Sequence, residues 1–353
     1  MIIKELIIGD LVAKIPIIQG GMGVGISRSS LAGAVAKLGG VGVLSGVQIG
    51  YDEEDFETNT INANLRALRK HIKRAKEISN NGIIGINFMV AMKEYETYVK
   101  EAIKSGIDLI ISGAGLPAKL PSLTKGTNTK IAPIVSSAKA AKVILKMWDR
   151  KDQTTADMLI VEGPNAGGHL GFSNEELDHI QEIDYDNEFK EILKIAKVFG
   201  DKFNKNIPVI AAGGISSSED VKKYIDLGAD GVQIGTRFIT TEECDADEKF
   251  KMAIVNAQKE DIQIVKSPVG LPGRAIKNKF IEKVKLNREN IEKCYNCLIP
   301  CNPKETPYCI SQALINAVKG DIDNALLFTG SEGYKIDRIS TVEEVVSDLT
   351  SKL

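Results

Sequence analysis

Short, continuous apolar runs rich in Val and Ile recur along the chain up to residue 235, and segments with helical periodicity separate them. Continuous rather than alternating apolar runs are typical of parallel strands that are buried on both faces. Their usual spacing of about 25 residues leaves room for one helix and two short loops. The eight predicted strands are Ile15–Gln19, Val41–Ser45, Ile83–Met89, Leu109–Ser112, Ile131–Ser136, Met158–Glu162, Val209–Ala212 and Gly231–Gly235.

Amphipathic patterns between these runs predict helices that follow the strands along the chain. The clearest are Ser29–Leu38, Tyr95–Ser105, Ala138–Trp148 and Ser218–Leu227. Eight strand–helix units favour an α/β fold of the closed (β/α)8 TIM-barrel type, since a doubly wound open sheet rarely needs so many regular steps. Two steps contain long polar loops, Gly46–Asn64 and Gly163–Asp186. Both follow the carboxyl end of a strand, where barrel enzymes carry their active-site loops.

The predicted barrel occupies residues 1–245 and leaves residues 246–353 as a second unit. The pattern in this second part is mostly helical, so we expect a helical extension or cap that contains the cysteine-rich segment 294–309. A length of 353 residues also fits two domains of ordinary size.

Composition and charge narrow the class of protein. The chain is 43% hydrophobic and 26% charged, as expected for a globular protein with a large core. A net charge of −2 argues against nucleic acid as the main partner. Lys4, Glu5 and Asp10 interrupt the amino-terminal segment, and Lys37 with several glycines interrupts the most apolar window, Leu31–Gly50. We therefore expect a cytoplasmic protein with no membrane partner.

Three strand ends are rich in glycine: Gln19–Gly23, Gly213–Gly214 and Gln233–Arg237. Glycine permits positive φ and a close approach of the backbone to a ligand. The loops after the seventh and eighth strands are the usual phosphate site of such barrels. Ser216 and Glu219 have capping-box spacing, which predicts a helix start just after the second glycine pair. Tight turns alone would explain any single pair, but three such ends favour a phosphate site.

His169 lies in the glycine-rich segment Val161–Gly171 that follows the sixth strand, and it is one of only three histidines. An imidazole there can transfer protons or donate a hydrogen bond to an atom that gains negative charge in the reaction. The neighbouring glycines would leave room for a flat ring system. The alternative is a loop histidine that binds a carbonyl. His71 and His179 are expected on solvated helix faces. Asn87, inside an apolar strand, could bind a ligand or an internal partner.

These motifs resemble the FMN-dependent nitronate monooxygenase family, which also includes flavin-dependent enoyl-acyl-carrier-protein reductases. The similar segments run in the family's order over residues 14–245, and they are Pro16–Met22, Gly85–Asn87, Ala166–Gly171, Ala211–Ile215 and Gly228–Phe238. The resemblance implies a TIM barrel that holds FMN without a covalent bond.

The resemblance also implies roles for individual residues. The histidine that matches His169 is the proposed catalytic residue beside the isoalloxazine. The flavin-binding positions on the ring side are Gln19, Gly20, Gly21, Met22, Asn87, Glu162, Gly167 and Gly168. The positions that hold the phosphate are Gly213, Gly214, Gln233, Ile234, Gly235 and Thr236. Pro164-Asn165 departs from the pattern of many members, which puts the shape of the substrate in doubt.

The expected reaction is the oxidation of alkyl nitronates by O2. One alternative is an FMN-dependent enoyl-thioester reductase that uses NAD(P)H. Another, from a different class, is a non-catalytic barrel that binds a phosphate ligand, although such a barrel needs no proton carrier at His169. An inosine-monophosphate-dehydrogenase-like barrel would need a cysteine in the loop after the sixth strand, and that loop has none. We expect a small-molecule substrate and leave open whether the chain forms a homodimer.

Four of the five cysteines follow the spacing C-x2-C-x3-C-x7-C at Cys294, Cys297, Cys301 and Cys309. Thiolates at this spacing could bind zinc or an iron–sulfur cluster, and the alternative is a set of reduced thiols in the cap. No metal ligand is assigned on spacing alone. Cys244 is isolated and is expected to pack in the core. Arg274 could meet an anionic substrate, but we expect a solvated loop arginine, because no acidic partner is visible nearby.

Overall fold

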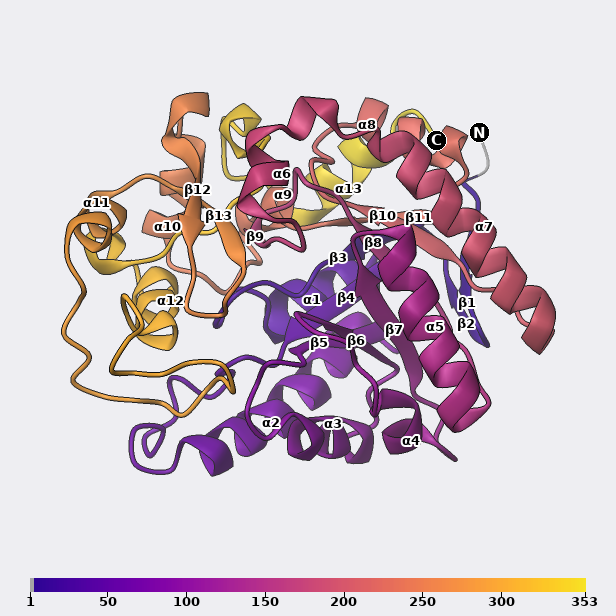
Figure 1. Ribbon diagram of the computed structural model, residues 1–353, viewed down its shortest axis with the longest axis horizontal. Helices are drawn as coiled ribbons and strands as arrows, with labels where there is room; N and C mark the ends of the chain where they lie inside the picture. The colour runs from indigo at the N-terminus through magenta and orange to yellow at the C-terminus, as the bar shows by residue number, and fades with distance from the viewer. Residues whose placement is uncertain (1–2) are drawn as a thin grey trace.

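The computed structural model describes residues 3–353 and contains a closed barrel of eight parallel strands in the order β10-β11-β3-β4-β5-β6-β7-β8 (Figure 1). Every predicted strand is a barrel strand, so the predicted fold is confirmed. The strands are β3 (Ile17–Gln19), β4 (Val41–Ser45), β5 (Ile83–Met89), β6 (Leu109–Gly113), β7 (Lys130–Val135), β8 (Leu159–Glu162), β10 (Val209–Ala212) and β11 (Gly231–Ile234).

Helices between these strands surround the barrel. They are α1 (Ser29–Lys37), α2 (Thr60–Ser79), α3 (Tyr95–Lys104), α4 (Leu120–Thr124), α5 (Ala138–Asp152), α7 (Tyr185–Phe203) and α8 (Ser218–Leu227). Four of them, α1, α3, α5 and α8, agree with the four predicted helices to within a few residues. The capping box at the start of α8 joins Ser217 to Asp220, not Ser216 to Glu219 as predicted. Both pairs have the required spacing, and the chain uses the one that lies one residue later.

The two predicted long loops are partly structured. The first is shorter than expected, because α2 already begins at Thr60. The second contains the two-residue strand β9 (Gly168–His169), helix α6 (Asn174–Asp178) and the 3-10 helix η1 (Ile180–Glu182). The predicted catalytic histidine therefore belongs to a strand rather than to an irregular loop.

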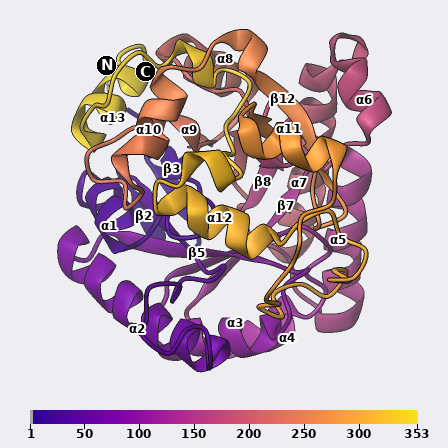
Figure 2. The same ribbon diagram turned by 90° about the vertical axis from the view of Figure 1, so that its left-hand side faces the viewer.

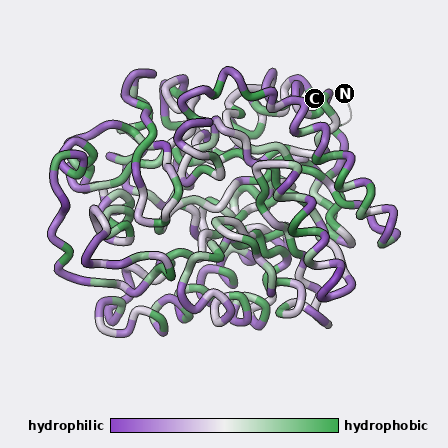
Figure 3. The backbone as a smooth tube through the Cα atoms, viewed as in Figure 1, coloured by the Kyte–Doolittle hydropathy of each residue, from purple (hydrophilic) through white to green (hydrophobic). Residues whose placement is uncertain are grey.

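Successive side chains of the barrel strands point alternately inward and outward, which divides the core into two layers. Ile18 and Val43 belong to the cluster inside the barrel, whereas Ile17 and Leu44 pack outward with the helices. The hairpin of β1 (Leu6–Ile8) and β2 (Leu11–Ala13) joins the inner cluster. Figure 3 shows hydrophobic stretches along the barrel strands and mixed colours along the surrounding helices.

Most of the chain after β11 lies against one end of the barrel, as the orange segments in Figures 1 and 2 show, whereas its last helix packs at the side of the barrel against α1 and α8. Its helices, as predicted, are α9 (Thr236–Ile239), α10 (Glu248–Val255), α11 (Lys279–Leu286), α12 (Ile310–Val318) and α13 (Val342–Thr350), with the short 3-10 helices η2 (Lys259–Asp261), η3 (Ile322–Asn324) and η4 (Gly333–Lys335). It also contains a hairpin that was not predicted, β12 (Ile262–Lys266) and β13 (Pro272–Ile276). Strand β13 pairs with β9 and completes a three-stranded antiparallel sheet.

Residues of this extension, such as Phe250 and Val342, share one apolar cluster with α1. The division of the chain after residue 245 stays a prediction. None of the helices within residues 3–353 has the length and apolar character needed to cross a membrane.

Candidate active site

A cavity of about 260 Å³ opens where the barrel strands end at their carboxyl side. Its wall contains every predicted site residue except Gln19, namely Gly20, Gly21, Met22, Asn87, Glu162, Gly167, Gly168, His169, Gly213, Gly214, Gln233, Ile234, Gly235 and Thr236. Gln19 is fully buried, and its side-chain amide both donates to and accepts from the backbone of Val43 at 3.1 Å. The structure thus brings the predicted residues together, and a ligand contact by Gln19 stays a prediction.

The strand pairing between β9 and β13 holds His169 at the cavity wall. Gly273 lies opposite His169 and Arg274 lies opposite Gly168 in this antiparallel pair. The backbone N–H of Leu170 donates to the carbonyl of Pro272 at 2.8 Å and continues the pairing. The imidazole packs edge-on against Phe328, with the ring centres 5.0 Å apart. The extension therefore sets the position of the predicted catalytic side chain.

Ser267, at the end of β12, contacts the His169 ring directly. Its Oγ lies 2.8 Å from Nε2 of the imidazole and also accepts the backbone N–H of Val269 at 3.3 Å. The Ser267 hydroxyl has no other acceptor within residues 3–353, so we infer that its hydrogen points to Nε2 and that the neutral ring carries its proton on Nδ1. Burial lowers the pKa of His169 to about 4, so the imidazole is neutral at physiological pH.

Arg274 corrects the expectation of a solvated loop arginine. Its side chain is buried, and Nη1 donates to the carbonyl oxygens of Pro164 and Ala166 in the loop after β8. Burial lowers the pKa of the guanidinium to about 10, so the group stays charged. These contacts bind the loop that leads to His169 onto the extension. The partners of Arg274 are carbonyls, which cannot be recognised as partners from the sequence.

Glu162 is the only acidic side chain among the predicted cavity residues, and it sits at the end of β8. Burial raises the pKa of its carboxyl group to about 8, so the group is mostly uncharged at neutral pH. The nearby Tyr185 hydroxyl is buried and has no hydrogen-bond partner within residues 3–353. Glu162 therefore presents a mostly uncharged carboxyl group to the cavity at neutral pH.

The loops after β10 and β11 form the other end of the cavity. Gly213 and Gly214 adopt φ values of +96° and +75°, which disfavour any side chain there. The carboxylate of Asp220 already accepts the backbone N–H groups of Ser216 and Ser217, which occupies the start of α8. Free donors lie just before it, since the N–H groups of Gly214 and Ile215 have no acceptor within residues 3–353.

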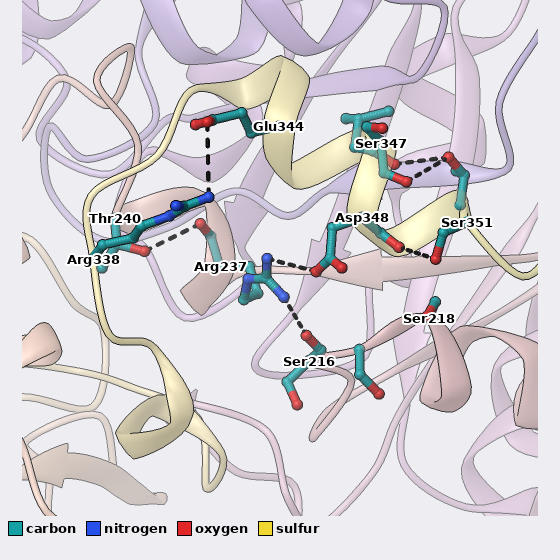
Figure 4. Close-up of polar contacts among 12 residues, drawn as sticks. Ser216, Ser218, Arg237, Thr240, Arg338, Glu344, Ser347, Asp348 and Ser351 are labelled. Atoms are coloured by element: carbon teal, nitrogen blue, oxygen red, sulfur yellow. Dashed lines mark hydrogen bonds and ion pairs between the residues drawn. The ribbon is translucent and has the colours of Figure 1, made fainter.

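Arg237 supports this end of the cavity and also lines it. Its guanidinium donates to the carbonyl of Ser216 and pairs with Asp348 of α13 at 2.9 Å (Figure 4). The neighbouring Thr236 accepts the N–H of Gly330 through its hydroxyl at 2.9 Å. Both contacts join the β11 end to the extension. The motif Gly228–Phe238 contains Arg237, but its role could not be predicted from the sequence, because its partner Asp348 lies 111 positions away.

The opposite wall of the cavity comes from the extension, and sequence analysis did not find it. Leu314, Leu326, Phe328, Thr329, Gly330, Glu332, Gly333 and Ile336 line this side. Most are apolar or small and lie in ordinary helical or loop contexts, so no local signal marks them. The cavity thus has a polar end near Gly214 and a largely apolar cover.

The other two histidines behave differently from each other. His179 is exposed as predicted, with its ring 3.3 Å from Glu182. His71 is half-buried, and its Nδ1 lies 3.0 Å from Oγ of Ser29, so the predicted solvated face was wrong. Burial and the charge of Arg28 lower the pKa of His71 to about 4. Ser29 and Arg28 reach this histidine from another part of the chain.

The cysteines are all free thiols, and Cys244 is buried as expected. Within residues 3–353, no group of three or more His, Cys, Asp or Glu side chains is arranged to hold a metal ion.

Comparison with known protein families identifies the family to which this chain belongs. A family model described as nitronate monooxygenase matches residues 4–352, nearly the whole chain. The chain belongs to the nitronate monooxygenase family. At the family level, the protein is therefore an oxidoreductase, and the predicted resemblance is confirmed.

Curated and solved relatives agree with this membership. A probable nitronate monooxygenase of Staphylococcus aureus strain Newman is 25% identical over 294 residues, which cover 76% of this chain and 77% of the relative. FabK from Thermotoga maritima is 27% identical, with a TM-score of 0.72 and coverage of 95% of this chain and 91% of FabK. The nitroalkane oxidase from Streptomyces ansochromogenes has the same TM-score at 20% identity and covers 96% and 95% of the two chains, which shows likeness of fold alone.

Proposed function

We propose that this member of the nitronate monooxygenase family binds FMN and oxidises alkyl nitronates with O2. The observation that carries the proposal is the cavity that joins the glycine ends of β10 and β11 to the imidazole of His169. Free N–H groups at one end and a proton-bearing ring at the other suit a phosphorylated, flat, redox-active cofactor together with a small substrate.

The residues present fit FMN. The buried Oε1 of Gln233 has no hydrogen-bond partner within residues 3–353, as expected for an atom that awaits a ligand. A Cβ at Gly20 would lie 3.3 Å from the Gln233 side chain, so glycine keeps this approach open. Gly214 and Ile215 would donate to the phosphate, and Asn87 and Glu162 would face the ring. When bound, FMN would supply the redox chemistry between the substrate and O2.

The chain's own contribution is to place and stabilise the substrate. A nitronate is an anion, and the neutral imidazole of His169 with its proton on Nδ1 would donate a hydrogen bond to a nitronate oxygen. A ring with a pKa near 4 is a weak base, so this geometry favours the donor role over proton abstraction from a neutral nitroalkane. The apolar cover formed by Leu326 and Phe328 would exclude water from the bound substrate.

The proposal is tested with purified full-length protein. We expect FMN to be released on denaturation, and we expect O2 consumption when an alkyl nitronate is added. Anaerobic mixing with NADH separates the main alternative, since rapid bleaching of the flavin and no turnover of nitronate would identify an enoyl-thioester reductase instead. A colourless protein that releases no flavin would reject both enzymes and favour a binding barrel.

Removing the hydroxyl of Ser267 is expected to weaken catalysis without removing FMN. Ser267→Ala deletes the hydrogen bond to Nε2, so turnover should fall roughly fivefold to tenfold, the equivalent of about 1 kcal/mol. Ser267→Thr keeps a hydroxyl and should recover part of the loss. Steady-state kcat and the flavin content of each variant provide the measurement. Equal rates for Ala, Thr and the unmodified chain would show that the ring needs no support from this side chain.

The buried carboxyl of Glu162 predicts a pH dependence on the alkaline side. Its pKa is raised to about 8, so the group is neutral below that pH and becomes an anion above it. A negative charge in the cavity would repel an anionic nitronate, and kcat/KM should fall by up to about tenfold per pH unit above pH 8. Glu162→Gln cannot ionise, so its profile should stay flat. An alkaline fall that persists in this variant would assign it to another group.

A further inference from the structure

The apolar cover of the cavity meets the barrel at the loop after β4. Val47 of that loop lines the cavity and packs in the same apolar cluster as Leu314, Leu326 and Phe328 of the cover. The N–H of Leu326 donates to a carbonyl of α12 at 3.1 Å, and Phe328 packs on the ring of His169 with the ring centres 5.0 Å apart. An apolar surface thus leads from the imidazole to α12.

Buried side-chain hydrogen bonds join α12 to the barrel beside this surface. Nε2 of Gln48 donates to Oγ of Ser311, in the first turn of α12, at 3.2 Å. The amide nitrogen of Asn64 in α2 donates to Oε1 of Gln48 at 2.8 Å and to the hydroxyl of Tyr98 in α3 at 3.1 Å. The exposed fractions of Gln48, Asn64 and Ser311 are 4%, 1% and 2%. A buried polar network whose members are paired holds the elements that it joins in one arrangement.

The backbone of Gln48 supports a role beyond simple packing. Its φ of +47° lies in the left-handed region, which a residue other than glycine keeps only where its surroundings hold it. Residues in this state cluster at functional sites. Here the turn directs the amide to Asn64 and Ser311, while the preceding residue, Val47, lines the cavity.

The hydrogen bond between Gln48 and Ser311 sets the spacing between the barrel and the cover. Ser311 and Leu314 are three positions apart in α12, so they lie on the same face of the helix. Gln48 directly follows Val47 in the loop after β4. The bond therefore fixes Leu314 relative to Val47, and both of these side chains line the cavity.

We propose that Gln48 and Ser311 are positioning residues that limit the length of the hydrocarbon chain of the substrate. The inference rests on the proposed function, in which the nitronate group binds at His169. The chain of the substrate would then extend along Phe328 toward Leu314, where the fixed position of α12 ends the space.

The charges around the cavity define the class of substrate further. Within residues 3–353, Arg237 is the only Lys or Arg side chain that lines the cavity, and it lies at the phosphate end. The apolar cover therefore offers no cation to a second acidic group. The expected substrates are nitronates with a short, uncharged hydrocarbon chain.

The test compares the nitronates of nitroethane and 1-nitrohexane with full-length protein that contains FMN. The unmodified chain should have the higher kcat/KM for the shorter nitronate. Ser311→Ala removes the bond from Gln48, so kcat/KM for the longer nitronate should rise about threefold to tenfold relative to the shorter one. Leu314→Ala widens the space directly and should shift the same ratio by about tenfold or more. Ser311→Thr keeps a hydroxyl and should keep the original ratio.

Tyr98→Phe is the matched control. It also removes one buried hydrogen bond of the network, but on the side of α3, and no residue of α3 lines the cavity. Its ratio should equal that of the unmodified chain, because a merely structural loss lowers both rates equally. Equal shifts in Tyr98→Phe and Ser311→Ala, or a shift in Leu314→Ala alone, would overturn the role given to Gln48 and Ser311. Thermal unfolding checks that each variant is folded.

Unreactive analogues separate this inference from the proposed function. Propanoate and heptanoate have a planar anionic head like that of the two nitronates, and calorimetric titration gives their dissociation constants without turnover. Ser311→Ala should shift the ratio of these constants in favour of heptanoate. A protein that shows this shift but oxidises no nitronate would reject the reaction alone. A preference of the unmodified chain for the longer ligand, or a ratio unchanged in Ser311→Ala, would reject the limit on chain length.

Discussion

His169→Ala is expected to lower turnover of an alkyl nitronate by about 10²–10⁴-fold while FMN stays bound. The imidazole lines the cavity, and Ser267 and Phe328 hold it in place. These contacts do not involve the loops after β10 and β11, where the phosphate is expected to bind. The loss should therefore appear in kcat and kcat/KM rather than in flavin content. Stopped-flow kinetics and the visible spectrum of the purified variant measure both quantities.

Two further variants sharpen this result. His169→Gln keeps an N–H donor but cannot take up a proton near neutral pH, so it should be more active than His169→Ala if the ring acts as a donor. His179→Ala removes an exposed imidazole that does not line the cavity and should leave the rate unchanged. A fully active His169→Ala enzyme with normal flavin would remove the residue from the mechanism.

Gly167→Ala is expected to destabilise the protein and weaken FMN binding together. A Cβ at this position would lie 2.5 Å from the carbonyl carbon of Thr329 and 2.6 Å from the backbone nitrogen of Gly330. Both are backbone atoms, so the extension itself would have to shift. Overpacking of this kind costs about 1–3 kcal/mol, and we expect the upper end of that range. Denaturant unfolding and flavin fluorescence titration provide the two measurements.

The adjacent glycine offers a matched control. Gly168 has a φ of +75°, but a Cβ there would meet nothing within 4 Å. Gly168→Ala should therefore carry only the strain of a left-handed backbone, about 1–2 kcal/mol, without displacing the extension. If Gly167→Ala were as stable as Gly168→Ala and bound FMN normally, the close packing of Gly167 against Thr329 would contribute neither to stability nor to FMN binding.

The barrel could be predicted from the sequence because each strand is buried on both faces. Such burial produces continuous apolar runs, for example Val41–Ser45, which no surface element imitates. The site residues at strand ends followed from the same reasoning, since in a parallel barrel the carboxyl ends of all strands meet at one face. Gly214 and His169 share one cavity for this reason, although they are 45 positions apart in the sequence.

Contacts that depend on distant partners could not be predicted. Ser267 and His169 are 98 positions apart, and nothing in either neighbourhood indicates the other. Arg274 was misjudged because its partners are the carbonyls of Pro164 and Ala166, and backbone acceptors leave no trace in a sequence. The capping box at α8 was placed one residue early, because Ser216–Glu219 and Ser217–Asp220 have equal spacing.

The pairing of β9 with β13 bears on the order in which the enzyme matures on the ribosome. The chain is made from its amino terminus, so the residues of all eight barrel strands are synthesised before residues 262–276. Until then, Gly168 and His169 have no neighbouring strand, and the imidazole has no fixed direction. A chain that ends before residue 262 therefore lacks the strand that holds His169 at the cavity wall, and we expect it to be inactive.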